Sequence, residues 1–129
     1  MPSIEAFTPQ VLERDWGQET IVAETPQYLG KVLRMWAGTK GGLQYHVEKD
    51  ETFHLFYGQA IVRFDRDGAL VGCQMMPGES YHIPAGAVHQ VEAITDCVFF
   101  EASTPHYDDR VRVEKEYGLP NGGGLPTTR

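Results

Sequence analysis

Four side chains able to bind a metal ion occur in two short segments of the sequence. Gln44 and His46 are two residues apart, so both project from one face if the segment is a strand. Glu51 begins the next expected strand and shares its face with large apolar residues, where a carboxylate is retained only when it is paired or metal-bound. His89 starts a strand after a turn that contains Pro and Gly. These four residues are the candidate metal ligands.

The donor set suits one borderline divalent ion. Two imidazole nitrogens, an amide oxygen and a carboxylate would hold such an ion and leave a coordination position open for water or substrate. The set carries a single negative charge, so the site would stay cationic and could polarise an oxygen. The alternative is a hydrogen-bonded polar cluster in the core, in which the same residues need no metal.

The elements that must position these residues are short strands. Segments rich in Val, Ile, Phe and Tyr, separated by many of the 14 Gly and 8 Pro residues, predict an all-β sandwich or barrel. The clearest hairpin turns at Asp67 and Gly68, because a tight turn requires positive φ angles. A short helical turn is expected within Pro9–Trp16. The predicted strands are Thr20–Glu24, Gly30–Ala37, Leu43–Val47, Glu51–Tyr57, Ala60–Asp65, Leu70–Met75, Ser80–Ile83, His89–Ala93, Cys97–Ser103 and Arg110–Val113.

Several other polar residues are expected outside the ligand set. The Glu-Lys-Asp sequence at 48–50 predicts a turn between two strands. His54 and His82 have the wrong strand parity to join the ligands, so we expect them on an outer face or in contact with solvent. The aspartates at 108 and 109 are candidates to pair with the arginines of the strand Arg110–Val113.

The ligands and their spacing resemble the cupin family. The second cupin motif is met except that Ala93 stands where it has Asn, and the first is met with Gln44 in place of a His. Nearly every element of both motifs coincides, which implies an all-β fold of the cupin type, a double-stranded β-helix or jelly-roll barrel. The matching residues are Gly38, Gln44, His46, Glu51 and Gly58 in the first motif and Gly78, Pro84, Gly86 and His89 in the second.

A narrower resemblance covers about Arg14 to Gly118 and points to the cupin domain of type II mannose-6-phosphate isomerases. In that group a Gln, a His, a Glu and a second His hold the metal, so Gln44 is the residue expected there. The resemblance implies a zinc-type metal, with manganese, nickel or iron as alternatives. It also implies aldose-ketose isomerisation of a sugar or sugar phosphate. The segments that carry it are Trp16-Gly17, Leu43–His46, Glu79–His89 and Glu101–Glu114.

Isomerisation of this kind needs a general base beside the metal. The metal would acidify the proton on the carbon next to the carbonyl and stabilise an enediolate, and a base would move that proton between neighbouring carbons. Glu101, Lys40, Tyr45 and His106 are all candidates for the base, and the sequence does not choose among them. Lys31 is one of several strand cations that could meet a phosphate or a sugar hydroxyl, or that could simply be solvated.

Two other functions compete with isomerisation. A noncatalytic cupin that binds a sugar or small metabolite is favoured by residues 47–50, Val-Glu-Lys-Asp, which replace the basic, His-rich stretch of the isomerase group. An iron-dependent cupin dioxygenase is the third hypothesis. Gln44 weakens it, because an amide oxygen is a poorer iron ligand than imidazole.

Composition limits the partners. Against 11 Lys and Arg stand 18 Asp and Glu, a net charge of -7, which argues against nucleic acid and against an anionic membrane surface. The N-terminal sequence lacks the pattern of a signal peptide, so a cytoplasmic location is expected. Cys73 and Cys97 lie in apolar surroundings and are expected to be buried, reduced thiols. We expect one cupin domain over residues 1–118 with an N-terminal strand extension, a flexible tail over 119–129, and a homodimer.

Overall fold

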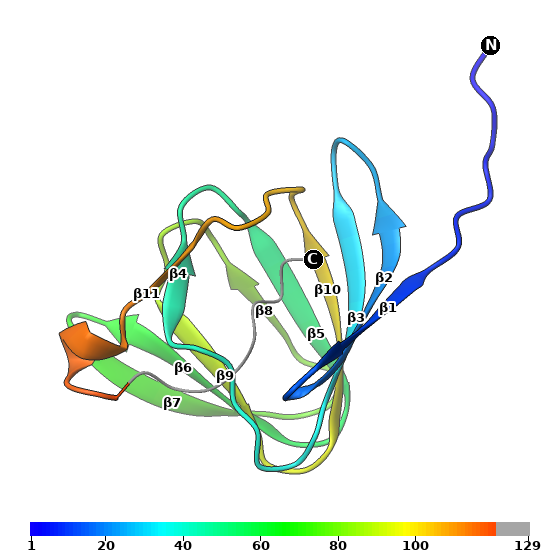
Figure 1. Cartoon of the computed structure of the whole chain (residues 1–129). Helices are drawn as coiled ribbons and strands as arrows, with labels where there is room; N and C mark the ends of the chain where they lie inside the picture. Colours follow the sequence, from blue (N-terminus) through cyan, green and yellow to red (C-terminus); the bar gives the residue numbers. More distant parts are fainter. Residues whose placement is uncertain (121–129) are drawn as a thin grey trace.

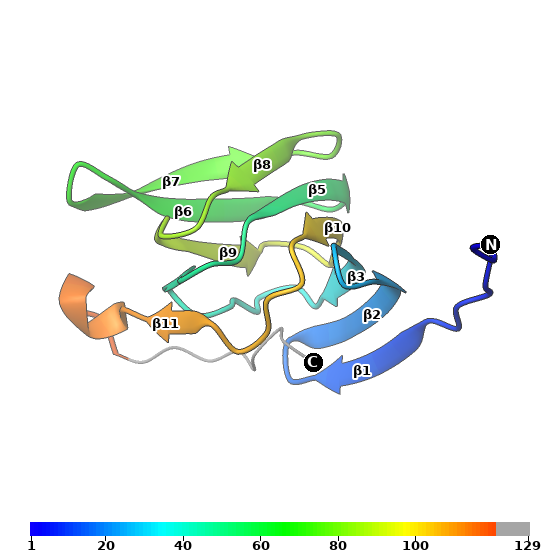
Figure 2. The ribbon, with the colours of Figure 1, turned by 90° about the horizontal axis from the view of Figure 1, so that it is seen from above.

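Two antiparallel sheets face each other in the computed structural model, which describes residues 1–120 (Figures 1 and 2). The six-stranded sheet has the order β1 (Gln10–Arg14), β2 (Gly17–Glu24), β3 (Leu29–Met35), β10 (Cys97–Ser103), β5 (Glu51–Tyr57) and β8 (Ser80–Ile83). The five-stranded sheet has the order β11 (Arg110–Arg112), β4 (Gln44–His46), β9 (His89–Ala93), β6 (Ala60–Arg66) and β7 (Ala69–Met75).

All the predicted strands are present, and those at β5, β8, β9 and β10 have the predicted bounds. The helical turn expected within Pro9–Trp16 is wrong, because this segment forms β1 and pairs with the edge of β2. An ion pair between Arg14 and Glu19 joins the two strands at 2.8 Å, so tertiary pairing overrides the local tendency to turn. A short 3-10 helix, η1 (Glu114–Tyr117), follows β11 and was not expected.

The hairpin between β6 and β7 confirms the turn predicted from the sequence. Arg66 lies opposite Ala69 in the register, which leaves Asp67 and Gly68 as the turn residues. Their φ angles are 55° and 88°, the positive values that a two-residue hairpin turn requires. Register along both strands then follows from this turn.

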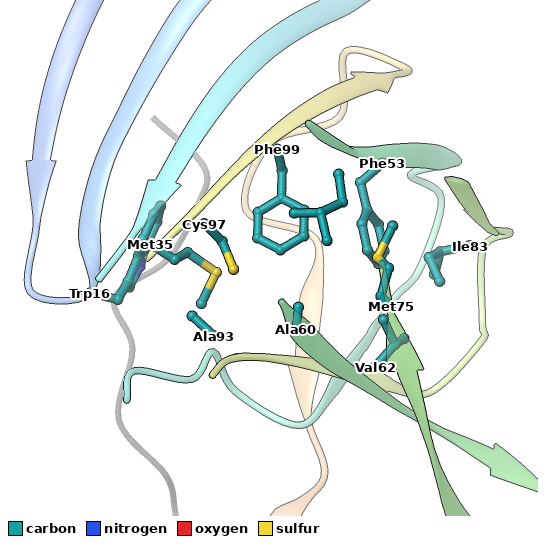
Figure 3. Packing of buried hydrophobic residues seen from close by; sticks show 11 residues of the cluster. Trp16, Met35, Phe53, Ala60, Val62, Met75, Ile83, Ala93, Cys97 and Phe99 are labelled. Atoms are coloured by element: carbon teal, nitrogen blue, oxygen red, sulfur yellow. The ribbon is translucent and has the colours of Figure 1, made fainter. Parts of the chain in front are cut away.

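The space between the sheets is divided into an apolar end and a charged end. Inward side chains of β10 run from Cys97 and Phe99 to Glu101 and Ser103. The register places Met35 opposite Cys97 but Lys31 opposite Glu101, so β3 changes character at the same level. Figure 3 shows the apolar end, where Trp16, Phe53 and Phe99 pack with smaller side chains of the opposite sheet. The charged end contains the candidate ligands.

The expectations for the two cysteines and for the C-terminal tail are confirmed only in part or lie outside the described residues. Cys97 is a buried free thiol as predicted, while the free thiol Cys73 is only half-buried. No helix within residues 1–120 combines the length and apolar character needed to cross a membrane. Most of the tail predicted to be flexible, residues 121–129, lies outside the described part of the chain.

Candidate metal centre

Three of the four candidate ligands converge at the charged end of the barrel. His46 ends β4, Glu51 begins β5 and His89 begins β9, and all three side chains are buried. Glu51 Oε2 lies 3.4 Å from His46 Nε2, and Glu51 Oε1 lies 3.8 Å from His89 Nε2. Ligand atoms bound tetrahedrally at about 2.1 Å lie roughly 3.4 Å apart. The three side chains are therefore spaced as ligands of one ion would be.

Gln44 supplies the fourth side chain of the set. It lies on β4 two residues before His46, opposite His89 in the register with β9. Its side chain is half-buried and lines the same cavity as the other three residues. The sequence expectation that Gln44 and His46 project from the same face agrees with this placement.

Both histidines present the same nitrogen to Glu51. His89 Nδ1 donates a hydrogen bond to the carbonyl oxygen of Ala87 at 2.9 Å, which leaves Nε2 with its lone pair. His46 Nδ1 lies 3.2 Å from Asp109 Oδ1 and donates to this carboxylate in the same way. Burial lowers the pKa of His46 although Glu51 opposes the shift, so the ring is favoured in its neutral form. Two imidazoles whose Nδ1 atoms are held by fixed acceptors, with Nε2 directed toward Glu51, are oriented as ligands of a divalent ion.

Asp109 holds more than the His46 ring. Its Oδ2 accepts hydrogen bonds from the backbone N–H groups of Glu48 and Lys49, each at 2.8 Å. Burial opposes ionisation of Asp109, but these two N–H groups outweigh it and lower the pKa. The expectation that Asp109 pairs with the neighbouring arginines is wrong. Its carboxylate instead turns toward β4, because β11 pairs with β4 and brings residue 109 beside Val47.

Lys49 is the main residue that sequence analysis missed. The predicted turn at residues 48–50 is present, but the Lys49 side chain points inward and is 1% exposed. Its Nζ lies 3.2 Å from Glu51 Oε2 and 2.9 Å from Glu101 Oε2. Burial disfavours the ammonium, yet the two carboxylates outweigh it and raise the pKa, so Lys49 is charged. A turn has no periodicity to reveal an inward side chain, so no sequence signal was available.

A second buried cation lies behind Glu101. Lys31 is fully buried on β3 and pairs with Glu19 Oε2 at 2.7 Å, whereas a solvated strand charge was the alternative considered for it. Burial raises the pKa of Glu101, but Lys49 and Lys31 outweigh this effect and lower it to about 2. Glu101 is therefore a carboxylate at neutral pH. Charges of alternating sign run from Arg14 across the sheet to the ligand Glu51.

A cavity of about 90 Å³ opens beside the candidate ligands. This space is large enough for several ordered waters or for one end of a small molecule. Among the residues that the structure describes, no Lys or Arg lines it. The lining residues are Trp16, Leu33, Met35, Gly41, Gly42, Gln44, His46, Glu51, Phe53, His89, Gln90, Val91, Phe99 and Glu101.

The four candidate bases differ in their relation to this cavity. Glu101 lines it, and its strand neighbour across the sheet is Phe53 of β5. Tyr45 alternates with Gln44 and His46 and lies opposite Val111, away from the cavity lining. Lys40 is exposed, and its backbone forms an isolated antiparallel β-bridge with that of Glu92. His106 contacts Thr104 at 2.8 Å and Glu48 at 3.5 Å at the rim, again outside the lining.

His54 and His82, which strand parity excluded from the ligand set, lie outside the candidate site. His54 is on the outer face of β5 and contacts the Ser80 hydroxyl at 2.7 Å. The side chain of His82 is 58% exposed and pairs with Asp50 at 2.8 Å. Strand parity alone was sufficient to separate these residues from His46 and His89.

Comparison with known proteins gives structural neighbours only, since the sequence matches no family profile and no curated protein. The capsular polysaccharide assembling protein CapF from Staphylococcus aureus superposes with a TM-score of 0.74 at 22% identity, over 84% of this chain and 32% of CapF. The chain thus spans about a third of the length of CapF.

Two further neighbours are covered over most of their length. KdgF from Halomonas sp. has a TM-score of 0.65 and 21% identity, over 80% of this chain and 92% of KdgF. A cupin-2 domain containing protein from Shewanella frigidimarina has a TM-score of 0.54 and 22% identity, over 78% of this chain and 82% of that protein. Together with the two facing antiparallel sheets, these neighbours show that the chain has the cupin fold, as the motifs predicted.

Proposed function

We propose that this cupin is a metal-dependent isomerase that interconverts the aldose and ketose forms of a sugar or sugar phosphate. One observation carries the proposal: a carboxylate that is not a candidate ligand, Glu101, lines the same cavity as His46, Glu51 and His89. Isomerisation requires this combination of an ion-binding set and a separate proton acceptor. A purely structural metal site would need only the ligands.

The residues present fit a divalent ion by spacing, by tautomer and by chemical type. His46, Glu51 and His89 would hold it, with Gln44 as a fourth ligand. A bound ion of the zinc type would supply Lewis-acid polarisation of the substrate carbonyl. The spacing does not select one metal. Imidazole and carboxylate ligands suit zinc, manganese, nickel and iron.

The chain's own groups would carry the proton. Glu101 is ionised at neutral pH and would take the proton from the carbon that bears the hydroxyl, then return it to the neighbouring carbon, while the hydroxyl proton passes to the former carbonyl oxygen of the enediolate. Its pKa of about 2 makes it a weak base, so the reaction would depend on strong acidification of the substrate carbon. The apolar side chains of Phe53 and Phe99 border this space and would limit the access of water to the carbanionic intermediate. Because the cavity is about 90 Å³, only the hydroxycarbonyl end of the substrate would enter.

The proposed substrate class is a carbohydrate with a free hydroxycarbonyl end. The similarity of fold to a capsular polysaccharide assembling protein supports a role with sugars. No cation lines the cavity within the described residues, so a phosphate group, if the substrate carries one, would lie outside it. Neutral sugars and sugar phosphates therefore belong in the same assay.

Isotope exchange tests the proposal directly. The protein is loaded with zinc or manganese and incubated in D₂O with mannose 6-phosphate and fructose 6-phosphate, and separately with mannose and fructose. Proton NMR then follows interconversion and loss of the proton at carbon 2 of the aldose or at carbon 1 of the ketose. We expect exchange with the wild type and at least a hundredfold slower exchange with Glu101→Gln, when both are assayed at saturating metal and the bound metal is measured. Metal-loaded protein that shows neither exchange nor interconversion on this panel would refute isomerase activity.

The second candidate is a noncatalytic cupin that binds a sugar or small metabolite. Within the described residues no Lys or Arg lines the cavity, which favours this function, because a sugar phosphate would find no cation there to hold its phosphate group. Saturable binding of a sugar that raises the melting temperature without any isotope exchange would select this function. Absence of binding to every carbohydrate tested would exclude it.

A further inference from the structure

A buried ammonium lies against the only carboxylate of the candidate ligand set. Lys49 Nζ is 3.2 Å from Glu51 Oε2, and both side chains are almost completely buried. The contact engages Oε2, which also lies 3.4 Å from His46 Nε2, whereas Oε1 lies 3.8 Å from His89 Nε2. Both oxygens thus face a histidine, but the ammonium competes with an ion for Oε2 only, which favours coordination through Oε1.

The position of Lys49 is determined from two directions. Its backbone N–H donates to Asp109 Oδ2 at 2.8 Å, the same carboxylate that accepts from the His46 ring. Its ammonium is held from the other side by Glu101 Oε2 at 2.9 Å. A lysine at a turn could extend into water at no desolvation cost, so burial of this one requires a compensating set of contacts, which these carboxylates supply.

The charges of this group balance without a metal. Along this series of ion pairs, Glu19, Glu51 and Glu101 carry three negative charges, and Arg14, Lys31 and Lys49 carry three positive charges. The negative charge of Glu51 is therefore already offset by Lys49 before any ion binds. An ion held by Glu51 would lie within roughly 5–7 Å of the Lys49 ammonium, with little water between them to screen the repulsion.

We propose that Lys49 is a positioning residue that holds Glu51 to one-oxygen coordination and offsets its charge, so that the bound ion stays electron-poor and polarises substrate strongly. This inference rests on the metal centre of the proposed function. On this inference, Lys49 lowers the affinity of the site for the metal and raises the Lewis acidity of the bound ion. Glu101 acts in the opposite direction, because its negative charge partly offsets that of Lys49.

The directions in which two substitutions change metal affinity distinguish this role from a purely structural one. Lys49→Met removes the repelling charge, so Co²⁺ or Zn²⁺ should bind at least tenfold more tightly than to the wild type. Glu101→Gln leaves Glu51 as the remaining carboxylate beside the ammonium, so the same ions should bind at least threefold more weakly. Lys49→Arg keeps the charge and should remain within about threefold of the wild type. If Lys49 only supported the fold, Lys49→Met would weaken metal binding instead.

Metal affinity is measured by competition with a chromophoric chelator, and the Co²⁺ d–d absorption reports coordination in the same samples. Lys49→Met should change this spectrum toward a higher coordination number, because Glu51 becomes free to bind through both oxygens. Circular dichroism and a melting curve check that each variant folds. If Lys49→Met does not fold, Lys49→Met/Glu101→Gln removes both charges of the pair and should bind metal at least tenfold more tightly than Glu101→Gln.

The outcomes keep the inference distinct from the proposed activity. Weaker metal binding by Lys49→Met than by the wild type, or by the double variant than by Glu101→Gln, would overturn the role assigned to Lys49. It would leave the proposed isomerase activity standing. An inactive protein that binds metal with these shifts in affinity would overturn isomerase activity and support the inference. A wild-type protein that binds none of the ions would overturn both.

Discussion

Replacing Asp109 by Asn tests whether one carboxylate organises the metal centre and the adjoining turn together. In the wild type Oδ1 accepts from His46 Nδ1 at 3.2 Å, and Oδ2 accepts from the N–H groups of Glu48 and Lys49 at 2.8 Å. Asn has one acceptor oxygen, so it can satisfy the His46 ring or the two backbone groups but not both. At least one contact to a charged acceptor is lost, which costs about 1.5–3 kcal/mol.

The effect on the metal should exceed the effect on the fold. If the oxygen of the introduced amide accepts from the backbone, its NH₂ group faces His46 Nδ1 and favours the tautomer protonated at Nε2. That tautomer has no lone pair directed toward Glu51 and cannot act as a ligand. Loss of such an orienting partner typically reduces metal affinity by about 10–100-fold. We expect Asp109→Asn to show this reduction together with a free energy of unfolding lowered by about 1.5–3 kcal/mol.

Three measurements check the prediction. Urea unfolding of the metal-free protein gives the stability, chelator competition gives the metal affinity, and long-range ¹⁵N–¹H NMR gives the His46 tautomer. Asp108→Asn is the matched control, because this neighbour is exposed and its φ of 54° is one that Asn tolerates well. An Asp109→Asn protein with stability within about 0.5 kcal/mol and metal affinity within about threefold of the control would refute the reasoning.

Three further outcomes are expected. Burial opposes ionisation of Glu114, but Arg112 and the backbone N–H of residue 43 outweigh it and lower its pKa to about 2. Its contribution is therefore complete above the unfolded pKa of 4.5 and is lost as the pH falls toward 2, so urea unfolding should show a loss of stability from pH 5 to 3 that Glu114→Gln reduces. Gly58→Ala should destabilise the protein by about 1–3 kcal/mol more than Gly78→Ala, measured in the same urea assay. Both glycines have similar φ values, 96° and 94°, but a Cβ on Gly58 would lie 2.2 Å from a backbone oxygen, whereas Gly78 has open space; equal losses would contradict this explanation. A homodimer is expected, so light scattering at micromolar concentration should give twice the 14.5 kDa chain mass, and a monomer would contradict the expectation.

Strand positions could be predicted well because period-two alternation and turn residues are local signals. The hairpin at Asp67 and Gly68 follows from the backbone angles that its turn requires. By contrast, the bounds and pairing of β1 could not be predicted, because they depend on the edge of β2 and on the contact of Arg14 with Glu19 of that strand. Its sequence is equally compatible with a short helical turn.

The candidate ligands illustrate what the sequence by itself determined. Spacing and strand parity placed Gln44, His46, Glu51 and His89 on inward faces and left His54 outside, because alternation in a strand depends only on residue number. The two motifs also predicted the cupin fold. These conclusions need no knowledge of which strands are neighbours in space.

The electrostatics of the centre were decided only by the tertiary structure. Lys49 is buried because Glu51 and Glu101, from two paired strands, both reach its ammonium. Asp109 controls the His46 tautomer from 63 residues away in the sequence, through the pairing of β11 with β4. A turn and a loop carry no periodic signal, and the charge of a buried group depends on its spatial neighbours. The sequence therefore identified the candidate ligands, while the folded chain determined their protonation, their orientation and the electrostatic field around them.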